Sequence, residues 1–421
     1  MTLRVLMISQ WYDPESGSAA QAGVIARALA RRGAHVEVLT GFPNYPSGTL
    51  APGYRVRAYQ RELLQGITVH RAPLWPSHDS APSRRALNYL SWAMGAGVVG
   101  LLKARQVDAV LVHSTPATAG LPALALHGVR RLPFVVQVQD LWPQTVVSSD
   151  FLREGRGSRV ERPLHAMCDA IYKRASAIAV TSPGMAPLIA ARGVPESKIS
   201  LAANWADEAV FRPAARDEAL ARRLGLSRPF TFMYAGNFGP YQGLDTLLDA
   251  AERLRHRGDI GLALVGGGVR EPWLRDEVSR RGLDAVTFVP PVPFTEMTDV
   301  LALGDAHLVS LQDLPLFRTT LPSKLQATLA AGKPVVGALT GDAADVIRES
   351  GAGHVVPPGD ASALAHAIAR LADAGPDQLL ALGRSARSYY ERTFSEEATS
   401  HVLLGLLHEA AGDRSTTDAA R

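Results

Sequence analysis

A hydroxyl and an ammonium stand at the start of an expected helix in the second half of the chain. In LPSKLQATLAAGKPVVGALTG, residues 321–341, Ser323 and Lys324 follow a proline, and the helical pattern stops at Gly332 before a Val-Val pair. The first N–H groups of a helix have no intrahelical partner and carry partial positive charge. Because an ammonium lies beside them, this stretch predicts a site for an anion at the start of the helix.

Two glycine-rich stretches end expected strands in the same half of the chain. They read YAGNFGPYQGL, residues 234–244, and VGGGV, residues 265–269. Glycine lets a backbone approach a ligand closely, but each stretch alone is equally typical of a tight turn between a strand and a helix. With Lys324 they bring three strand ends around one crevice, because the carboxyl ends of parallel strands share one edge. This arrangement favours a phosphate site over a lysine on bare surface.

The first half offers a carboxylate and an imidazole at the ends of two further expected strands. Asp140 lies in VQDLWPQ, residues 138–144, and His113 lies in LVHSTP. Asp140 either caps the next element or orients or deprotonates a substrate hydroxyl, and His113 is either a core residue or a ligand contact. The chain has no Asp-x-Asp sequence, so a paired-carboxylate metal site is not indicated. We expect neither a metal nor another cofactor.

The elements that must position these residues alternate between apolar strands and helices. LRVLMIS, residues 3–9, is a near-continuous apolar run, as expected for a strand that is covered on both faces. Similar runs follow at 35–40, 107–114, 133–140 and 175–182, and then at 230–236, 261–268, 286–292, 306–312 and 334–338. Strand followed by helix, repeated in this way, predicts doubly wound sheets.

A charged stretch with prolines, residues 207–229, breaks this alternation. We therefore expect an α/β protein with two Rossmann-like domains that face a central cleft. The expected divisions are an N-terminal domain over 1–207, a linker over 208–229, a C-terminal domain over 230–395, and a final helix with a polar tail over 396–421. A length of 421 residues fits two cores better than one.

Composition excludes several classes of protein. A hydrophobic content of 47%, a charged content of 20% and a net charge of +4 are typical of a globular protein and do not indicate a nucleic-acid partner. The single cysteine, Cys168, excludes an internal disulfide and a cysteine-rich metal site, and its apolar surroundings predict a buried thiol. The start of the chain, MTLRVLMISQWYDP, reads as a core strand and not as a signal peptide, so we expect the protein in the cytoplasm.

One segment of the first half leaves three interpretations open. RRALNYLSWAMGAGVVGLLK, residues 84–103, is apolar in its middle, and basic residues flank it: Arg84, Arg85, Lys103 and Arg105. It can be a buried crossover helix, a helix that also dips one face into a membrane interface, or a transmembrane span. The first two are preferred, because a span would break the regular alternation of strands and helices.

Five motifs, taken in order, resemble those of a known enzyme family over nearly the whole chain. They are SQWYDPESG, QDLWPQ, NWAD at 204–207, YAGNFGPYQGL and LPSKLQATLAAGKPVV. The chain is similar to the retaining glycosyltransferases of family four, which have the GT-B fold. Within that family it resembles bacterial colanic-acid and O-antigen transferases of the N-acetyl-L-fucosamine type.

The resemblance implies a hexosyltransferase that acts with retention and without a metal. It would move a sugar from a nucleotide sugar, preferably a UDP-sugar, to a saccharide or lipid-linked acceptor in cell-surface polysaccharide or lipopolysaccharide biosynthesis. The C-terminal half would bind the donor and the N-terminal half the acceptor, with peripheral contact at the inner face of the plasma membrane. Lys324 and helix amides would stabilise the leaving diphosphate as the glycosidic bond breaks.

The resemblance also assigns roles to single residues. Asp140, His113 and Lys324 would be catalytic, and Ser16, Gly17 and Trp142 would bind the acceptor. The expected donor-binding residues are Gly236, Asn237, Gly239, Gln242, Gly266, Gly267, Arg318, Ser323 and Lys324.

Two departures from the family pattern leave other functions open. The family usually has glutamates at the positions of Thr319 and Ala327, and a lysine often follows the first C-terminal strand, where this chain reads Pro-Tyr-Gln at 240–242. Arg318 either supplies a second positive charge or is a surface arginine. The alternatives are a nucleotide-sugar 2-epimerase, which would need two carboxylates for proton transfer, and a non-catalytic paralogue that binds nucleotide sugar.

Overall fold

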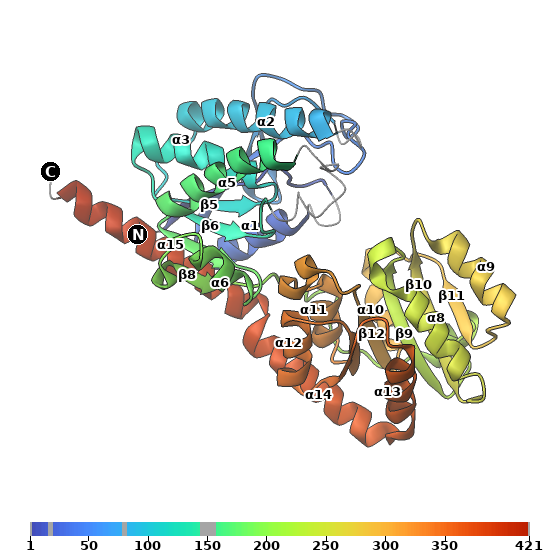
Figure 1. The fold of residues 1–421 in the computed structure, drawn as a ribbon. Helices are drawn as coiled ribbons and strands as arrows, with labels where there is room; N and C mark the ends of the chain where they lie inside the picture. Colours follow the sequence, from blue (N-terminus) through green and yellow to red (C-terminus); the bar gives the residue numbers. More distant parts are fainter. Residues whose placement is uncertain (1, 16–19, 78–81, 144–156, 420–421) are drawn as a thin grey trace. The chain divides into compact units, whose positions relative to one another are not determined.

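The computed structural model describes residues 2–15, 20–77, 82–143 and 157–419 (Figure 1). Contacts between residues divide the chain into two compact units: unit 1 consists of Met1–Ala203 with Thr399–Arg421, and unit 2 of Asn204–Ala398. Each unit contains a largely parallel sheet with helices in the connections. The expected α/β class with two Rossmann-like sheets is confirmed.

The sheet of unit 1 has the strand order β3-β4-β2-β1-β5-β6-β7-β8 in the described residues, and only the pair β3 and β4 is antiparallel. The strands are β1 (Arg4–Ile8), β2 (His35–Gly41), β3 (Gln60–Leu64), β4 (Ile67–Ala72), β5 (Ala109–Ser114), β6 (Phe134–Val138), β7 (Ala177–Val180) and β8 (Ile199–Leu201). The helices are α1 (Gln21–Arg31), α2 (Pro82–Lys103), α3 (Gly120–Arg130), α5 (Gly157–Arg174), α6 (Met185–Ala190) and α15 (Glu396–Ala419), with short turns η2 (Ala117–Ala119) and η3 (Glu196–Lys198).

Segment 84–103 forms most of α2, which packs on the sheet of unit 1 next to α3 (Figure 1). Trp92 of α2 is fully buried in a core cluster with Leu6 and Ile8 of β1 and Leu126 of α3. The segment is therefore a crossover helix. No helix among the described residues is long and apolar enough to cross a membrane.

The sheet of unit 2 has the order β11-β10-β9-β12-β13-β14 in the described residues, and all its pairs are parallel. The strands are β9 (Phe230–Asn237), β10 (Ile260–Gly267), β11 (Val286–Val289), β12 (Ala306–Ser310), β13 (Val335–Ala338) and β14 (Gly353–Val356). The helices are α7 (Glu218–Arg223), α8 (Leu244–Arg253), α9 (Glu271–Arg281), α10 (Met297–Ala302), α11 (Ser323–Ala330), α12 (Asp342–Ser350), α13 (Ala361–Asp373) and α14 (Gly375–Thr393), with turns η4 (Pro240–Gln242), η5 (Phe294–Glu296) and η6 (Pro315–Thr319).

The side chains of β9 alternate between the two faces of this sheet and contribute to the core on each face. Phe232 and Tyr234 lie in a core cluster with residues of α8 and α13, whereas Met233 lies in a second cluster with Ala221 of α7 and Val300 of α10. Successive side chains of a strand point to opposite faces, so the continuous apolar run FTFMY is what a doubly covered strand requires. β9 is thereby held rigidly up to the point where its glycine-rich stretch begins.

Residues 208–229, expected as a linker, lie within unit 2. They contain α7, whose first N–H groups donate to the carboxylate of Asp217, and they bury Ala221 and Leu226 against the sheet. At the other end of the chain, α15 belongs to unit 1 from Thr399 onward. The helix continues to Ala419, through the segment that was expected to be a polar tail. Buried apolar side chains, which the charged sequence conceals, attach the stretch 208–229 to unit 2.

The hairpin of β3 and β4 is not among the expected strands. Its turn is made by Gln65 and Gly66, whose φ angles are 48° and 83°, the left-handed values that a two-residue hairpin turn uses. Leu63 in β3 is 70% exposed, so the edge strand carries little of the apolar pattern by which strands are recognised.

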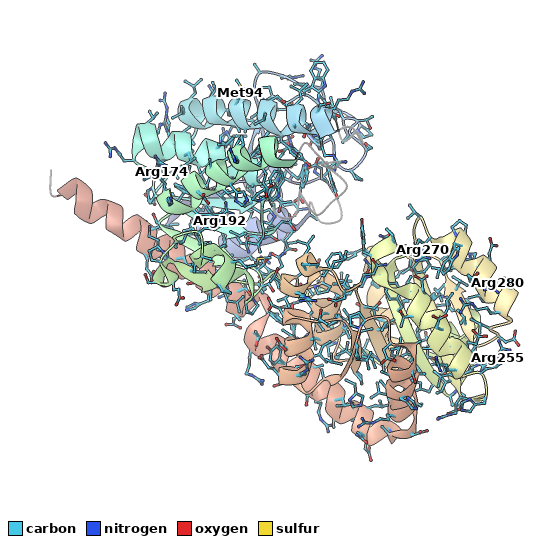
Figure 2. The ribbon with its side chains drawn as sticks, viewed as in Figure 1. Met94, Arg174, Arg192, Arg255, Arg270 and Arg280 are labelled. Carbon is cyan, nitrogen blue, oxygen red and sulfur yellow. The ribbon has the colours of Figure 1, made fainter. Side chains whose placement is uncertain are left out.

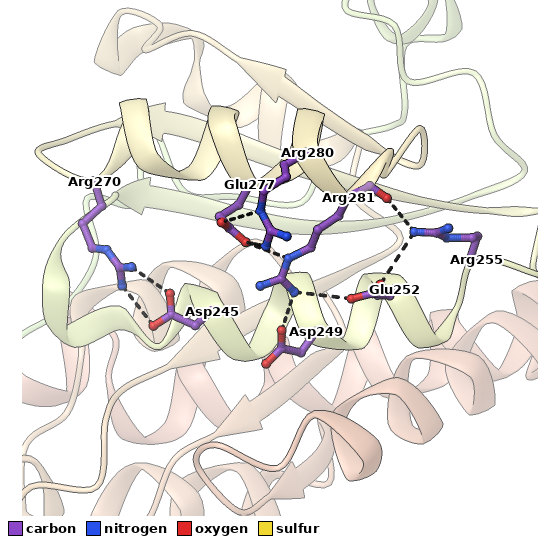
Figure 3. A network of polar contacts seen from close by, with 8 residues as sticks. All are labelled: Asp245, Asp249, Glu252, Arg255, Arg270, Glu277, Arg280 and Arg281. Atoms are coloured by element: carbon purple, nitrogen blue, oxygen red, sulfur yellow. Dashed lines mark hydrogen bonds and ion pairs between the residues drawn. The ribbon is translucent and has the colours of Figure 1, made fainter.

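A network of ion pairs joins α8 to α9 near the ends of β9 and β10 (Figure 3). The guanidinium of Arg281 lies 2.5 Å from Asp249, 2.7 Å from Glu277 and 3.5 Å from Glu252. Arg270, which precedes α9, pairs with Asp245 in the first turn of α8 at 2.8 Å. The Arg281 pairs join the end of α9 to α8, whereas the Arg270–Asp245 pair fixes the start of α8 relative to the start of α9, where the glycine-rich stretches lie.

Candidate active site

Lys324 lies in the first turn of α11, which begins at Ser323. Pro322 is extended, with φ −65° and ψ 133°, and its ring makes continuation of a helix backwards unfavourable. Leu325 and Leu329 are fully buried and fix the helix on the sheet. The helix therefore starts where the sequence predicts, with the lysine in its first turn.

The ammonium of Lys324 is held by two neutral oxygen atoms. Its Nζ donates to the hydroxyl of Tyr234 at 2.5 Å and to Oε1 of Gln242 at 2.6 Å, and it lies 4.4 Å from the centroid of the Tyr234 ring. Burial lowers the pKa of Lys324 to about 8. In the described residues no carboxylate forms an ion pair with this ammonium. A cation that is desolvated in this way still lacks a counter-charge.

Two glycines at the ends of adjacent strands leave the space in which this lysine lies. Gly236 and Gly266 are paired in the register of β9 and β10, and their φ angles are 142° and 126°. A Cβ on Gly236 would overlap Cε of Lys324, and a Cβ on Gly266 would overlap the carbonyl oxygen of Gly236. Any side chain at either position would displace the lysine or separate the strands.

Four further expected donor-side residues lie at these strand ends, and the structure brings them near the lysine to different degrees. Gln242 contacts it directly, and the Gln242 carbonyl accepts a hydrogen bond from Ser310 Oγ at 2.5 Å. Asn237 is connected through its carbonyl, which accepts from the Tyr234 hydroxyl at 2.7 Å. Gly239 is packed against the side chain of Asn237, and Gly267 is paired with Asn237 across the two strands.

Arg318 and Ser323, two other expected donor-side residues, are more exposed than the residues that contact Lys324. Arg318 lies in η6 with its side chain 58% exposed, and its guanidinium is 3.2 Å from the Asp313 carboxylate. The structure thus pairs Arg318 with a carboxylate on its own segment. Ser323 is exposed at the first position of α11. The Asp313 carboxylate therefore partly neutralises Arg318, the residue expected to supply a second positive charge at the site.

His113 of unit 1 is a buried, neutral imidazole near the carboxyl end of β5. Its Nδ1 lies 3.3 Å from Gln137 Oε1 and 3.3 Å from Gln139 Nε2, and burial lowers its pKa to about 4. An uncharged ring of this kind can donate or accept a hydrogen bond near neutral pH but adds no positive charge. The sequence left its burial open, and the structure makes it a core residue at a strand end.

Asp140 and Trp142 follow β6 in the same unit. Burial raises the pKa of the Asp140 carboxyl above its ordinary value, a change that favours a group able to take up a proton. The ring of Trp142 meets that of Tyr89 edge to face, with centroids 6.2 Å apart. The Trp142 carbonyl accepts from Arg192 at 2.8 Å, which ties this loop to the end of α6.

Ser16 and Gly17 lie outside the described residues. The described part of their loop is organised by Glu15, which is buried and accepts backbone hydrogen bonds from Tyr12, Asn44 and Tyr45 at 3.0, 2.8 and 2.8 Å. Burial raises the pKa of Glu15, and these N–H groups oppose that rise. Sequence reasoning did not single out Glu15, and only its place in a polar loop between a strand and a helix could have indicated it.

Tyr234 is the other residue that sequence reasoning missed. It lies inside an apolar strand and is fully buried, so the pattern classes it with the core aromatics. Cys168 is also buried, as expected, and burial raises its pKa to about 11, which leaves the thiol protonated. Among the described residues no group of three or more His, Cys, Asp or Glu side chains is arranged to hold a metal ion.

Two family models match the chain in succession. Residues 16–205 match a glycosyl transferase 4-like domain, and residues 229–374 match glycosyl transferases group 1. The chain is 28% identical to the colanic acid biosynthesis glycosyl transferase WcaI of Escherichia coli (strain K12), over 97% of this chain and 100% of that protein. It is 26% identical to a GDP-mannose-dependent alpha-mannosyltransferase of Mycobacterium tuberculosis, over 99% of both chains.

Solved structures give the same fold. Sucrose-phosphate synthase from Thermosynechococcus elongatus superposes with a TM-score of 0.72 at 19% identity, over 100% of both chains. HepE of Anabaena, in complex with UDP, superposes with a TM-score of 0.71 at 17% identity, over 97% of this chain and all of that one. With two glycosyltransferase domains in succession and a two-sheet fold shared over its whole length, the chain belongs to the glycosyltransferases of the GT-B fold.

Proposed function

We propose that the enzyme transfers a sugar, with retention and without a metal, from a nucleotide-sugar donor to a saccharide or lipid-linked acceptor. The pathway we propose is the biosynthesis of a cell-surface polysaccharide or lipopolysaccharide. The relationship to a colanic acid biosynthesis enzyme over the whole chain supports this choice. Unit 2 would take the donor and unit 1 the acceptor.

The observation that carries the proposal is the half-buried ammonium of Lys324 without a carboxylate partner. It lies in the first turn of a helix, where unpaired N–H groups also favour negative charge. The diphosphate of a donor would supply the missing counter-charge. As the glycosidic bond breaks, charge increases on that diphosphate, and a fixed ammonium stabilises the transition state more than the ground state.

A UDP-sugar is the preferred donor. HepE was solved with UDP and with UDP-glucose, which supports a uridine nucleotide for a chain of this fold, whereas one relative uses GDP-mannose. Donor-side contacts are proposed for the glycines 236, 239, 266 and 267 and for Asn237, Gln242, Arg318, Ser323 and Lys324. A thermal-shift screen of UDP-, GDP- and dTDP-sugars tests the choice, because a ligand at about 100 times its Kd adds about 2.7 kcal/mol of stability.

Unit 1 would hold the acceptor with groups at the carboxyl ends of β1, β5 and β6. Ser16, Gly17 and Trp142 are proposed as contacts. Asp140, whose pKa burial raises, would orient the acceptor hydroxyl or take its proton. The neutral imidazole of His113 would help position the reacting sugar.

The outer side of α2 supports peripheral contact with a membrane, at the cytoplasmic face where the enzyme would work. Five large apolar side chains recur there at helical spacing and are 48–75% exposed: Leu87, Leu90, Met94, Val98 and Leu102. Met94 projects away from the sheet (Figure 2). Arg84, Lys103 and Arg105 are exposed at the two ends. An apolar stripe between basic ends fits a bilayer surface with anionic lipids.

Lys324→Met should reduce kcat/KM by a factor of about 10² to 10³, the usual effect of losing one charge-stabilising donor, or about 2.7–4 kcal/mol. Methionine keeps the apolar stem, so the fold should persist. Steady-state kinetics with the donor found by the screen measure the effect. Lys198→Met is the control. This lysine belongs to unit 1 and donates to the Ala175 carbonyl, so its loss should not affect the proposed donor site of unit 2. Equal activity in Lys324→Met and wild type would remove the lysine from the mechanism.

Chelation should leave turnover unchanged. The leaving diphosphate is proposed to be stabilised by Lys324 and helix N–H groups, and these do not depend on a metal ion. The assay compares initial rates with EDTA, with added Mg²⁺ and with added Mn²⁺. A rate that EDTA abolishes and either ion restores would contradict the proposed stabilisation.

The protein should float with liposomes that contain anionic lipid, and salt should weaken this binding. Each basic residue near such a surface contributes about 1 kcal/mol, and salt screens that attraction. Replacing Met94 and Val98 by Glu should abolish flotation, because both side chains are exposed and their loss leaves the core intact. Leu380→Glu, at an exposed position of α14, is the matched control. Absence of flotation by the wild type at low salt would leave α2 as a crossover helix only.

A further inference from the structure

The hydroxyl of Tyr234 can only accept from Lys324. It donates its own proton to the carbonyl of Asn237 at 2.7 Å, so an oxygen lone pair faces the ammonium 2.5 Å away. The two hydrogen bonds run in one direction, from the lysine through the phenol to the backbone. Bonds in such a chain polarise and strengthen one another.

The position of the phenol is fixed by the core. Tyr234 is fully buried in β9, and its ring lies 6.0 Å from that of Phe238 in the same cluster. The lysine Nζ lies 4.4 Å from the centroid of this ring and 2.5 Å from its hydroxyl oxygen, at the hydroxyl edge of the ring. Tyr234 therefore holds the ammonium with its hydroxyl.

Gln242 holds the ammonium from a second side. Its Oε1 accepts from Nζ at 2.6 Å, and its own backbone carbonyl is anchored by Ser310 at the end of β12. Gln312 adds a further anchor to the same turn, because its Nε2 donates to the Pro240 carbonyl at 3.0 Å. The acceptor from η4 is thus as fixed as the acceptor from β9.

Charged groups on the elements around α11 are engaged elsewhere. Asp313 and Arg318 pair with each other, and Arg387 of α14 pairs with Glu391 and donates to the Ala330 carbonyl, at the opposite end of α11. His307 of β12 bonds to the Leu301 carbonyl, and burial lowers its pKa to about 3. The clamp around Lys324 is therefore neutral.

We propose that Tyr234 and Gln242 are positioning residues that form a neutral clamp, which fixes the ammonium of Lys324 over Gly236 while leaving its charge for the donor diphosphate. This inference rests on the proposed function of Lys324. A carboxylate in place of either residue would hold the lysine equally well but would neutralise it. Neutral acceptors orient the cation and keep its full attraction for an anion.

The clamp determines how binding depends on pH. Lys324 is charged below a pKa of about 8, so the affinity for a nucleoside diphosphate should weaken above pH 8. Below about pH 6.5 the terminal phosphate of the nucleotide takes up a proton, which affects all variants equally. Tyr234→Phe keeps the ring and removes one acceptor of the charged form, which lowers the pKa of the lysine further. The alkaline limb of the pH profile, which is the pH range in which nucleotide binding weakens, should shift to lower pH by about one unit, the effect of one hydrogen bond to a charged group. Binding should be restored at pH 6.5.

The experiment measures the Kd of UDP and of GDP by calorimetry from pH 6 to pH 9.5. Tyr390→Phe is the matched control, because Tyr390 is also fully buried in unit 2 and its hydroxyl bonds to the Ala206 carbonyl and to Glu208. That variant loses a comparable hydrogen bond and should not move the pH profile. An unmoved limb in folded Tyr234→Phe, or an equal movement in Tyr390→Phe, overturns the clamp.

Gln242→Glu gives a test of opposite sign. A carboxylate at this position should raise the pKa of the lysine, move the alkaline limb to higher pH and weaken nucleotide binding at pH 7 because it competes with the diphosphate. Tighter binding or a downward shift contradicts the proposal. Undiminished binding by Lys324→Met, or no binding of either nucleotide at pH 6.5, overturns both the donor site and the clamp. Weakened binding by Lys324→Met with unmoved limbs in both clamp variants overturns the clamp alone.

Discussion

A half-buried lysine ammonium without a carboxylate partner is the interaction on which the donor side of unit 2 depends. Removing a charge from water costs free energy, and here the cost appears as a pKa lowered from 10.5 to about 8. Two neutral oxygens offset part of this cost. A site of this kind is stable enough to form and is completed by an anion, which is the requirement for binding a diphosphate that must later leave.

The surrounding fold can be understood as what keeps this lysine in place. Gly236 and Gly266 provide the space, and β9 fixes Tyr234 because both faces of the strand are covered. The ion pair of Arg270 with Asp245 joins the starts of α8 and α9, the helices that follow β9 and β10 (Figure 3). In the family pattern a lysine often occupies the turn where this chain has Gln242. Here Gln242 receives the ammonium of Lys324, so the cation reaches the same turn from α11.

The local sequence pattern predicted the central strands of both sheets and the start of α11, because apolar runs and a proline before a helix act within a few residues. It did not predict the edge strands such as β3. It could not predict the clamp, because the contact joins residues 234 and 324, and a tyrosine in an apolar strand looks like any core aromatic. The α7 segment was concealed by charge, although two buried apolar residues attach it to unit 2. The sequence left the role of Arg318 open, because no sequence pattern indicates its ion pair with Asp313, five residues earlier.

The most direct test of the central claim is the pKa of Lys324 itself, measured with and without nucleotide. The ¹³Cε resonance of labelled lysine reports the protonation of each ammonium, and Lys324→Met identifies the signal. A half-buried charge without a counter-charge should titrate near pH 8 in the free protein and at higher pH with UDP bound, because the diphosphate stabilises the charged form. An ordinary value near 10.5 in the free protein, or one that saturating nucleotide leaves unchanged, would contradict the account.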